Sequence, residues 1–187
     1  SITYTATLGA AAQAPVLVTL SNSSIITIAS GASTGTVSVA ARTDDSYDQG
    51  TTTVTASITN ATGGNFETLT ASGGAASTTV VDDEDATSVS LTASGGGTEG
   101  QSITYTATLG AAAQADTFVT LSNGSVITIG SGASTGTVSV AARTDDSYDQ
   151  GTSTVTASIS SATGGNFETL TASGGAASTT VVDDEDA

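Results

Sequence analysis

The stretch SITYTATL, residues 102–109, decides the fold of this chain. In it isoleucine, tyrosine, alanine and leucine alternate with serine and threonine, which is the period of two expected for a half-buried β-strand. Threonine, isoleucine and tyrosine also favour strands by themselves. The same eight letters stand at residues 1–8, so the sequence contains this strand twice.

The repeat extends far beyond this stretch. Residues 1–86 match residues 102–187 at a constant offset of 101 positions, without a gap, and 77 of the 86 pairs are identical. One repeat of about 101 residues has the usual size of a domain. We therefore expect two domains, residues 1–85 and 86–187, with the first copy lacking the N-terminal strand of the second.

Seven short strands are expected in the complete second copy. Strands at this regular spacing, separated by glycine clusters, predict an all-β fold of tandem immunoglobulin-like β-sandwiches. Residues 166–172 form either an extra strand or an irregular crossover, and Asn123-Gly124 favours a type I′ hairpin turn. The expected strands are residues 88–94, 102–109, 117–121, 126–129, 136–141, 153–159 and 178–182.

Composition excludes several functions. A net charge of -16, with 18 acidic and two basic side chains, argues against binding to nucleic acid or to an anionic membrane surface. Without histidine or cysteine the chain has no zinc finger, imidazole base or thiol nucleophile. Its apolar runs are too short to cross a bilayer and no signal peptide is recognised, so we expect a mature internal stretch.

The acidic residues are concentrated in four groups that hold 14 of the 18 carboxylates. In a sandwich whose strands run alternately up and down, Glu99, the loop 145–149 and the exit 183–186 share one end. Clustered carboxylates repel one another, and Ca²⁺ offsets this repulsion because it takes about 6 to 8 oxygen ligands in irregular loops. The alternative is that these loops are simply solvated and keep a hydroxyl-rich protein soluble.

Three motifs resemble a known family. Each copy ends in TTVVDDED and contains VSVAARTDDSYD, and TEGQ follows the first strand of the second copy. These motifs resemble the tandem repeats of giant bacterial biofilm adhesins of the RTX type and, more distantly, the Calx-beta motif. The resemblance implies extender domains on the bacterial cell surface, with Ca²⁺ at domain ends and junctions. The calcium ligands that it implies are Glu99, Asp145, Asp146, Asp149, Asp183, Asp184 and Asp186 in the second copy, and Asp44, Asp45, Asp48, Asp82, Asp83 and Asp85 in the first.

The acidic exit of the first copy leads almost directly into the second. The two domains are therefore expected to abut at an end that also carries Asp116, where a shared Ca²⁺ would stiffen the joint. Arg42 and Arg143 precede the acidic loops and are expected to form exposed ion pairs of about 0 to 1 kcal/mol. Tyr47 and Tyr148 are expected to be tyrosine corners.

Near-identical tandem repetition favours a structural extender, because repetition adds length and no binding specificity. Its expected partners are neighbouring repeats of the same chain. The alternative is a self-assembling extracellular filament, in which a strand from another protomer completes the first sandwich. A sugar-binding module ranks third, since the chain has no tryptophan and little aromatic surface. An enzyme is the least favoured reading, because the acidic groups come without a pocket signature.

Overall fold

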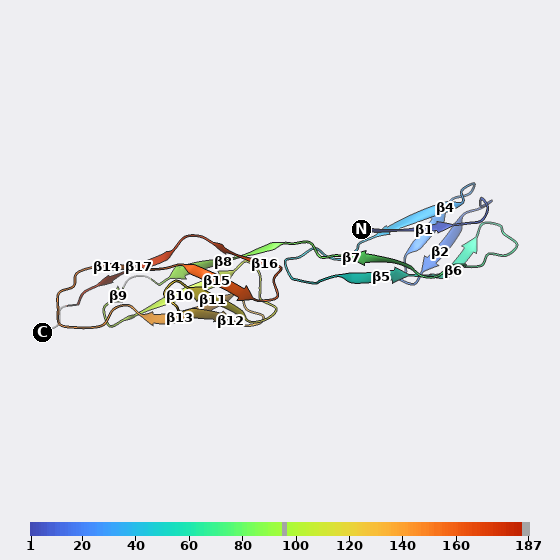
Figure 1. Cartoon of the computed structure of the whole chain (residues 1–187). Helices are drawn as coiled ribbons and strands as arrows, with labels where there is room; N and C mark the ends of the chain where they lie inside the picture. The colour runs from blue at the N-terminus through green and yellow to red at the C-terminus, as the bar shows by residue number, and fades with distance from the viewer. Residues whose placement is uncertain (95–96, 185–187) are drawn as a thin grey trace. The chain divides into compact units, whose positions relative to one another are not determined.

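All regular secondary structure is β-strand in the computed structural model, which describes residues 1–94 and 97–184 (Figure 1). In that described part of the chain, no helix is long and apolar enough to cross a membrane. The chain divides into two compact units. Unit 1 comprises Ser1–Asp44 and Gln49–Asp83, and unit 2 comprises Asp45–Asp48 and Glu84–Ala187.

Unit 1 contains seven strands in three small sheets. The sheets have the orders β1-β4, β3-β2-β6 and β5-β7. Alternation places one face of β2 and one face of β3 inside, so that valine, leucine and isoleucine from these two strands form most of the core. The strands are β1 (Ile2–Thr7), β2 (Val16–Leu20), β3 (Ile25–Ile28), β4 (Thr34–Val39), β5 (Thr52–Ala56), β6 (Ile58–Gly63) and β7 (Ala76–Val80).

Unit 2 is an immunoglobulin-like β-sandwich, and its described residues form ten strands. The chain crosses the sandwich seven times, and three of these crossings are divided into two strands that belong to different sheets. Its sheets have the orders β13-β10-β8-β16, β12-β11-β15 and β14-β17-β9. The strands are β8 (Ala86–Ala93), β9 (Gly97–Thr98), β10 (Ser102–Leu109), β11 (Thr117–Leu121), β12 (Val126–Ile129), β13 (Thr135–Ala141), β14 (Ser153–Ala157), β15 (Ile159–Gly164), β16 (Thr169–Ser173) and β17 (Ala177–Val182).

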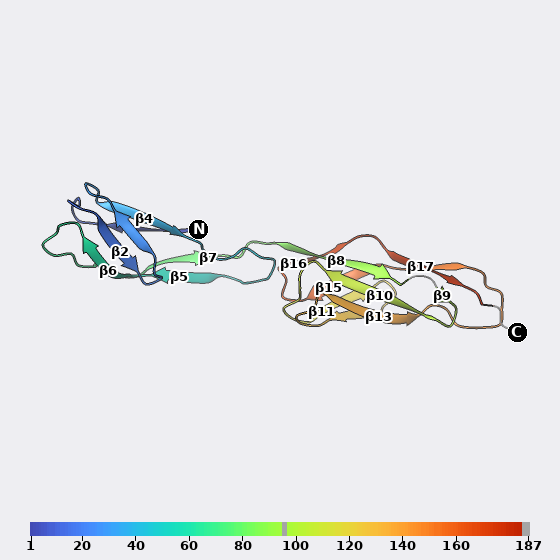
Figure 2. The same cartoon turned by 180° about the vertical axis from the view of Figure 1, so that it is seen from behind.

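The strand quoted at the outset is central to unit 2. It forms β10, which pairs antiparallel with β13 on one edge and with β8 on the other, as both views show (Figures 1 and 2). Its four apolar side chains are all buried, and Tyr105 is fully buried. The predicted strands 102–109, 117–121 and 126–129 are confirmed at their full extent as β10, β11 and β12.

The expected strand 153–159 is wrong as a single element. It divides at Ser158 into β14, which pairs with β17, and β15, which pairs with β11. At the division Ser122 N donates to Ser158 O at 2.8 Å, and Ser158 N donates to Ser122 Oγ at 3.1 Å. These bonds hold the chain where it crosses from one sheet to the other, so one alternating stretch serves both sheets.

Most of strand β16 (Thr169–Ser173), which pairs parallel with β8, lies in the undecided segment 166–172. Farther along the chain, β17 pairs parallel with β9. The offsets agree closely, since Thr169 pairs with Ala86 (169 − 86 = 83) and Val181 pairs with Gly97 (181 − 97 = 84). β16 and β17 therefore run in the same direction, along β8 and β9, and together count as one crossing of the sandwich. The extra strand leaves the up-and-down order of the crossings unchanged.

The turn between β11 and β12 differs from the type I′ turn that the sequence predicts. Gly124 has a φ of 83°, whereas Asn123 is not among the described residues with positive φ, and a type I′ turn needs positive φ at both central positions. Gly124 N donates to Leu121 O at 3.0 Å, and Leu121 N donates to Ser125 O at 2.8 Å. The connection is a three-residue loop with one left-handed residue, and the type I′ prediction is wrong.

Candidate metal centre

Three passes of unit 2 end at the same place. β9 and β17 run side by side in parallel, so Glu99 and Asp183 leave the sheet together. The segment after β13 joins them, since Gly100 N donates to Arg143 O at 3.0 Å. The segments after β9, β13 and β17 meet because these three strands run toward the same end of unit 2.

Glu99 is fixed from both sides. Its own amide donates to Val182 O at 3.0 Å, which continues the β9–β17 pairing by one residue. The next residue, Gly100, has a φ of 72°, a left-handed conformation that L side chains rarely adopt. This turn directs the Glu99 side chain inward, and only 2% of the residue is exposed.

Arg143 links two carboxylates. Its Nε donates to Glu99 Oε2 at 2.8 Å, and its Nη2 donates to Asp183 Oδ1 at 2.9 Å. The side chain of Glu99 is fully buried in this pair, and those of Arg143 and Asp183 are mostly buried. The expectation of exposed ion pairs is therefore wrong for Arg143. It is also wrong for Arg42, whose pair with Asp82 leaves only 20% and 17% of the two side chains exposed.

The second carboxylate oxygen of Glu99, Oε1, lacks the hydrogen bond that Oε2 accepts from Arg143. Oε1 is buried and has no hydrogen-bond partner among the described residues. Burial raises the pKa of Glu99 above its ordinary value of 4.5, and the nearby Asp183 raises it further, while the bond from Arg143 acts in the opposite direction. A buried acceptor without a donor is costly, so this oxygen is one that a bound cation would satisfy.

Two more carboxylates face the same point. Glu99, Asp145 and Asp184 each offer an oxygen, and these oxygens all lie within 4.8 Å of one another. Glu99 is buried, whereas Asp145 and Asp184 are exposed. Together with Asp183 and Arg143, the group carries four negative charges and one positive charge, a net charge of -3. The oxygen-only donor set suits Ca²⁺, a hard divalent cation.

The other predicted ligands of unit 2 have structural partners. Asp146 accepts from Tyr148 N at 2.9 Å and from the Gln150 side chain, and these bonds shape the acidic loop. Asp149 Oδ1 accepts from Gly151 N at 3.1 Å. Asp183 uses both oxygens, one for Arg143 and one for Gln150 N at 3.1 Å. The predicted ligands of unit 2 therefore include residues that shape the loops and three whose carboxylates converge, namely Glu99, Asp145 and Asp184.

Gly100 was not singled out from the sequence, although it is part of the TEGQ motif. A Cβ atom there would lie 3.2 Å from Asp145 Cβ and 3.5 Å from its Cγ. The glycine thus combines a left-handed backbone with close approach to a carboxylate of the group. The Glu99-Gly100 pair within the TEGQ motif is the sequence signal that could have found it.

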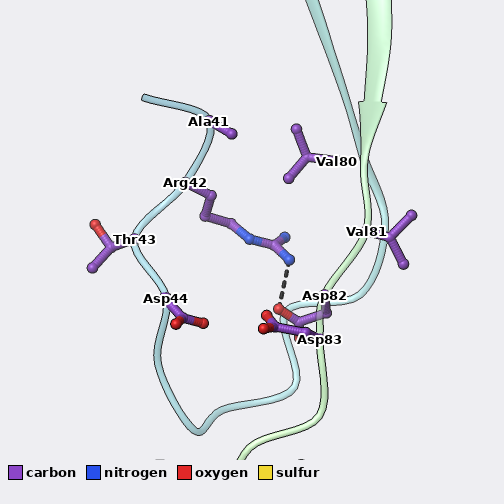
Figure 3. A pocket seen from close by; sticks show the side chains of 8 residues that line it. All are labelled: Ala41, Arg42, Thr43, Asp44, Val80, Val81, Asp82 and Asp83. Carbon is purple, nitrogen blue, oxygen red and sulfur yellow. Dashed lines mark hydrogen bonds and ion pairs between the residues drawn. The ribbon is translucent and has the colours of Figure 1, made fainter. Parts of the chain in front are cut away.

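The matching end of unit 1 has a simpler arrangement. Arg42 Nη2 donates to Asp82 Oδ1 at 2.5 Å (Figure 3). Arg42 Nη1 also donates to Gly50 O at 3.1 Å. Asp44 and Asp83 line the same pocket, which has a volume of about 190 Å³ and is shown in Figure 3. Within the described part of the chain, the group of three converging carboxylates occurs at the end of unit 2 alone.

Three predicted ligands of the first copy lie within the bounds of unit 2. Asp45 Oδ1 accepts from Tyr47 N at 2.9 Å, and Asp48 N donates to Asn166 O at 3.1 Å. Asp85 N donates to the carboxylate of Glu168. These contacts are separate from the group around Glu99.

The tyrosine corners are not present. Tyr47 stacks on Phe167 with ring centroids 5.3 Å apart, and its hydroxyl donates to Ala112 O at 2.5 Å. The second tyrosine, Tyr148, is 76% exposed. A tyrosine corner bonds the backbone a few residues upstream, so neither residue fits that description.

Two predicted ligands remain. Asp116 lies just before β11, at the opposite end of unit 2 from Glu99, and its Oδ1 accepts from Ser131 N at 3.1 Å. Asp186 lies outside the described residues. The converging group is therefore Glu99, Asp145 and Asp184, with Arg143 and Asp183 beside it.

The fold and this end group define a class: tandem all-β sandwiches with an acidic end and a short acidic connection between repeats. The LapA domain family model matches residues 1–83 and 85–184, so the chain belongs to the LapA domain family. No curated protein matches the chain. A solved structure described as a tetra-tandem repeat in the extending region of a large adhesion protein is similar, with 20% sequence identity and a TM-score of 0.31. The match covers 94% of this chain and 42% of that one, so the chain spans less than half of that structure.

Proposed function

We propose that this chain is a length of structural extender in a large bacterial cell-surface adhesin, stabilised by Ca²⁺ at the acidic ends of its repeats. Membership of the LapA domain family and the tandem repetition support the extender role. In this role the chain carries no catalytic site and holds a distant adhesive domain away from the cell, for surface attachment or biofilm formation.

The observation that carries the calcium part is the buried Oε1 of Glu99, which has no hydrogen-bond partner among the described residues, in a carboxylate that converges with those of Asp145 and Asp184. Arg143 already satisfies the other Glu99 oxygen, so the guanidinium and a cation would bind different atoms of the same carboxylate. A divalent cation would change the net charge of the group from -3 to -1. It would therefore relieve repulsion that the single arginine leaves.

The ligands would join three exits of the sandwich. Glu99 follows β9, Asp145 follows β13 and Asp184 follows β17, so one ion would tie all three segments together. The segment after β17 corresponds to residues 82–85 of the first copy, which continue along the chain into β8. Fixing the start of such a segment would reduce its conformational freedom and stiffen a chain of repeats.

The test is thermal unfolding by calorimetry at constant ionic strength, in calcium and in EGTA. We expect calcium to raise the unfolding temperature of unit 2, because a ligand bound only by the folded state stabilises it by about 2.7 kcal/mol at about 100 times its Kd. Small-angle scattering of the same samples should report a stiffer particle in calcium.

Asp145→Asn and Asp184→Asn should abolish most of the calcium-induced shift. Asp149→Asn is the matched control: it removes one charge from the same loop, while the amide oxygen can still accept from Gly151 N. An equal loss of the shift in all three variants would mean that calcium acts on general charge, and would contradict a specific site. A full shift in the first two variants would exclude them as ligands.

A further inference from the structure

The loop between β11 and β12 carries a chemistry that the fold does not use. Asn123-Gly124 in this loop is the single Asn-Gly pair of the chain, and both residues are exposed. Glycine has no Cβ, so its backbone nitrogen is open to the amide carbon of the preceding side chain. An asparagine followed by glycine can therefore react with its own main chain.

The turn holds the amide of Asn123 close to the main chain that follows it. Asn123 Oδ1 accepts from Ser125 N at 3.1 Å, an Asx turn that folds the side chain back over the Gly124 peptide. The same hydrogen bond draws electron density from Cγ, which makes this carbon a better electrophile. A Cβ atom on Gly124 would meet no described atom within 4 Å beyond its chain neighbours, so the surroundings leave space for a ring to close.

One hydrogen bond opposes such a reaction. Gly124 N donates to Leu121 O at 3.0 Å, and this bond must open before the nitrogen can attack. A typical internal hydrogen bond lowers the population of the free amide by about fivefold. Because the turn lies at the surface, it can open locally while the rest of the unit stays folded. The bond therefore slows the reaction without preventing it.

We propose that Asn123 deamidates through a cyclic imide formed with Gly124. The Gly124 nitrogen gives up its proton to hydroxide and bonds to Asn123 Cγ, the Cγ–Nδ2 bond breaks, and ammonia leaves. Water then adds to one of the two imide carbonyl groups and opens the ring. The products are aspartate and isoaspartate, each with one added negative charge.

The first repeat contains a matched control for this reaction. Asn22 is held in the same turn, since Ser24 N donates to Asn22 Oδ1 at 3.1 Å and Ser23 N donates to Leu20 O at 2.9 Å. The residue after Asn22 is a serine, whose Cβ stands beside the attacking nitrogen and obstructs ring closure. The two turns thus share their hydrogen bonds and differ at the position that controls the rate.

The two products differ in their effect on unit 2. Aspartate keeps an oxygen that can accept from Ser125 N. Isoaspartate instead adds a methylene group to the main chain, inside a loop that Leu121 N closes by donating to Ser125 O at 2.8 Å. The neighbouring Ser122 is bonded to Ser158, where the chain changes sheet. Isoaspartate should therefore lower the unfolding temperature of unit 2, and aspartate should leave it nearly unchanged.

The test is incubation of the full chain at mildly alkaline pH in EGTA, which keeps the outcome independent of the proposed calcium site. Peptide mapping by mass spectrometry measures the amide that remains at each asparagine over time. Most of Asn123 should be converted to a mixture of aspartate and isoaspartate before Asn22 loses a detectable fraction. Equal rates at the two positions would overturn the proposal, as would full persistence of both amides.

Exchange of the residues that follow the two asparagines tests the cause. Gly124→Ser should slow the conversion of Asn123 to the rate of Asn22, and Ser23→Gly should raise the conversion of Asn22 to the rate of Asn123. Each variant carries the residue that the other repeat has in the same left-handed turn, so both are compatible with the fold. Unchanged rates in both variants would mean that the next residue's nitrogen is not the attacking atom, and would contradict the cyclic imide.

A chain carrying Asn123→Asp is the reference for the added charge without the added methylene group. It should unfold at the temperature of the fresh protein, whereas the incubated chain should unfold at a lower temperature in proportion to its isoaspartate content. An equal loss of stability in the Asn123→Asp chain would assign the effect to charge and would contradict the role of the altered main chain.

Discussion

Ser23 and Gly124 occupy the same turn position in the two repeats. Both backbones are left-handed, with φ of 67° at Ser23 and 83° at Gly124. Both amides close the turn, from Ser23 N to Leu20 O at 2.9 Å and from Gly124 N to Leu121 O at 3.0 Å. Serine in this conformation brings its Cβ close to the carbonyl oxygen, at a cost of roughly 1 to 2 kcal/mol, and glycine avoids that cost.

Exchange of the two residues should therefore change stability in opposite directions. Ser23→Gly should stabilise unit 1 by up to about 1 kcal/mol, since the greater freedom of unfolded glycine offsets part of the gain. Gly124→Ser should destabilise unit 2 by a similar amount. Calorimetric unfolding of both variants measures the changes, and a destabilising Ser23→Gly would contradict the argument.

The group around Glu99 shows which features of a candidate site a sequence can predict. The alternation of strand direction is enough to bring Glu99, Asp145 and Asp184 to one end, and the structure places them there. The pattern does not reveal that Arg143 is mostly buried against Glu99 and Asp183, because that pairing joins residues about 40 positions apart in the sequence. Nor does it separate the converging carboxylates from Asp146, whose oxygens are used within its own loop.

At the scale of elements, one five-residue sequence adopts two structures. TLTAS forms β16 at Thr169–Ser173, whereas the same letters at 68–72 form no strand in unit 1. The partner of β16 is β8, and unit 1 has no described strand in that place. Strand formation here depends on a partner distant in sequence, which is why local propensity left the segment undecided.

The division between β14 and β15 was missed for a related reason. Alternation continues from Val155 through Ala157 to Ile159, so the pattern indicates one strand. The change of sheet is instead marked by the register shift between Thr120 and Leu121 on the partner strand, which no local pattern shows. The sequence therefore predicts where the chain crosses the sandwich more reliably than it predicts which sheet each strand joins.

Gly164 at the end of β15 provides the prediction at this scale. Its φ is 92°, and a Cβ there would lie 2.3 Å from the backbone oxygen of Asp116. Gly164→Ala should thus combine backbone strain of roughly 1 to 2 kcal/mol with overpacking of about 1 to 3 kcal/mol. Urea unfolding of unit 2 measures the sum.

Gly124→Ala is the matched control for that variant. Its φ is 83°, yet no described atom lies within 4 Å of the added Cβ, so it reports the backbone term alone. Equal losses in the two alanine variants would mean that the close approach of β15 to Asp116 contributes nothing to stability.

At the scale of the whole chain, two units with nearly the same sequence should differ in stability. Tyr4 and Ala6 are each 7% exposed in unit 1, whereas Tyr105 and Ala107 are fully buried in unit 2. The uncovered β7 adds more exposed surface, and buried apolar area contributes about 25 cal/mol per Å². Unit 1 should therefore unfold at the lower temperature.

Calorimetry in EGTA should resolve this order, and the turn variants assign the transitions because each changes one unit. Ser23→Gly should raise the lower transition and Gly124→Ser should reduce the upper one. If Ser23→Gly moved the upper transition instead, the difference in burial would not set the order of unfolding.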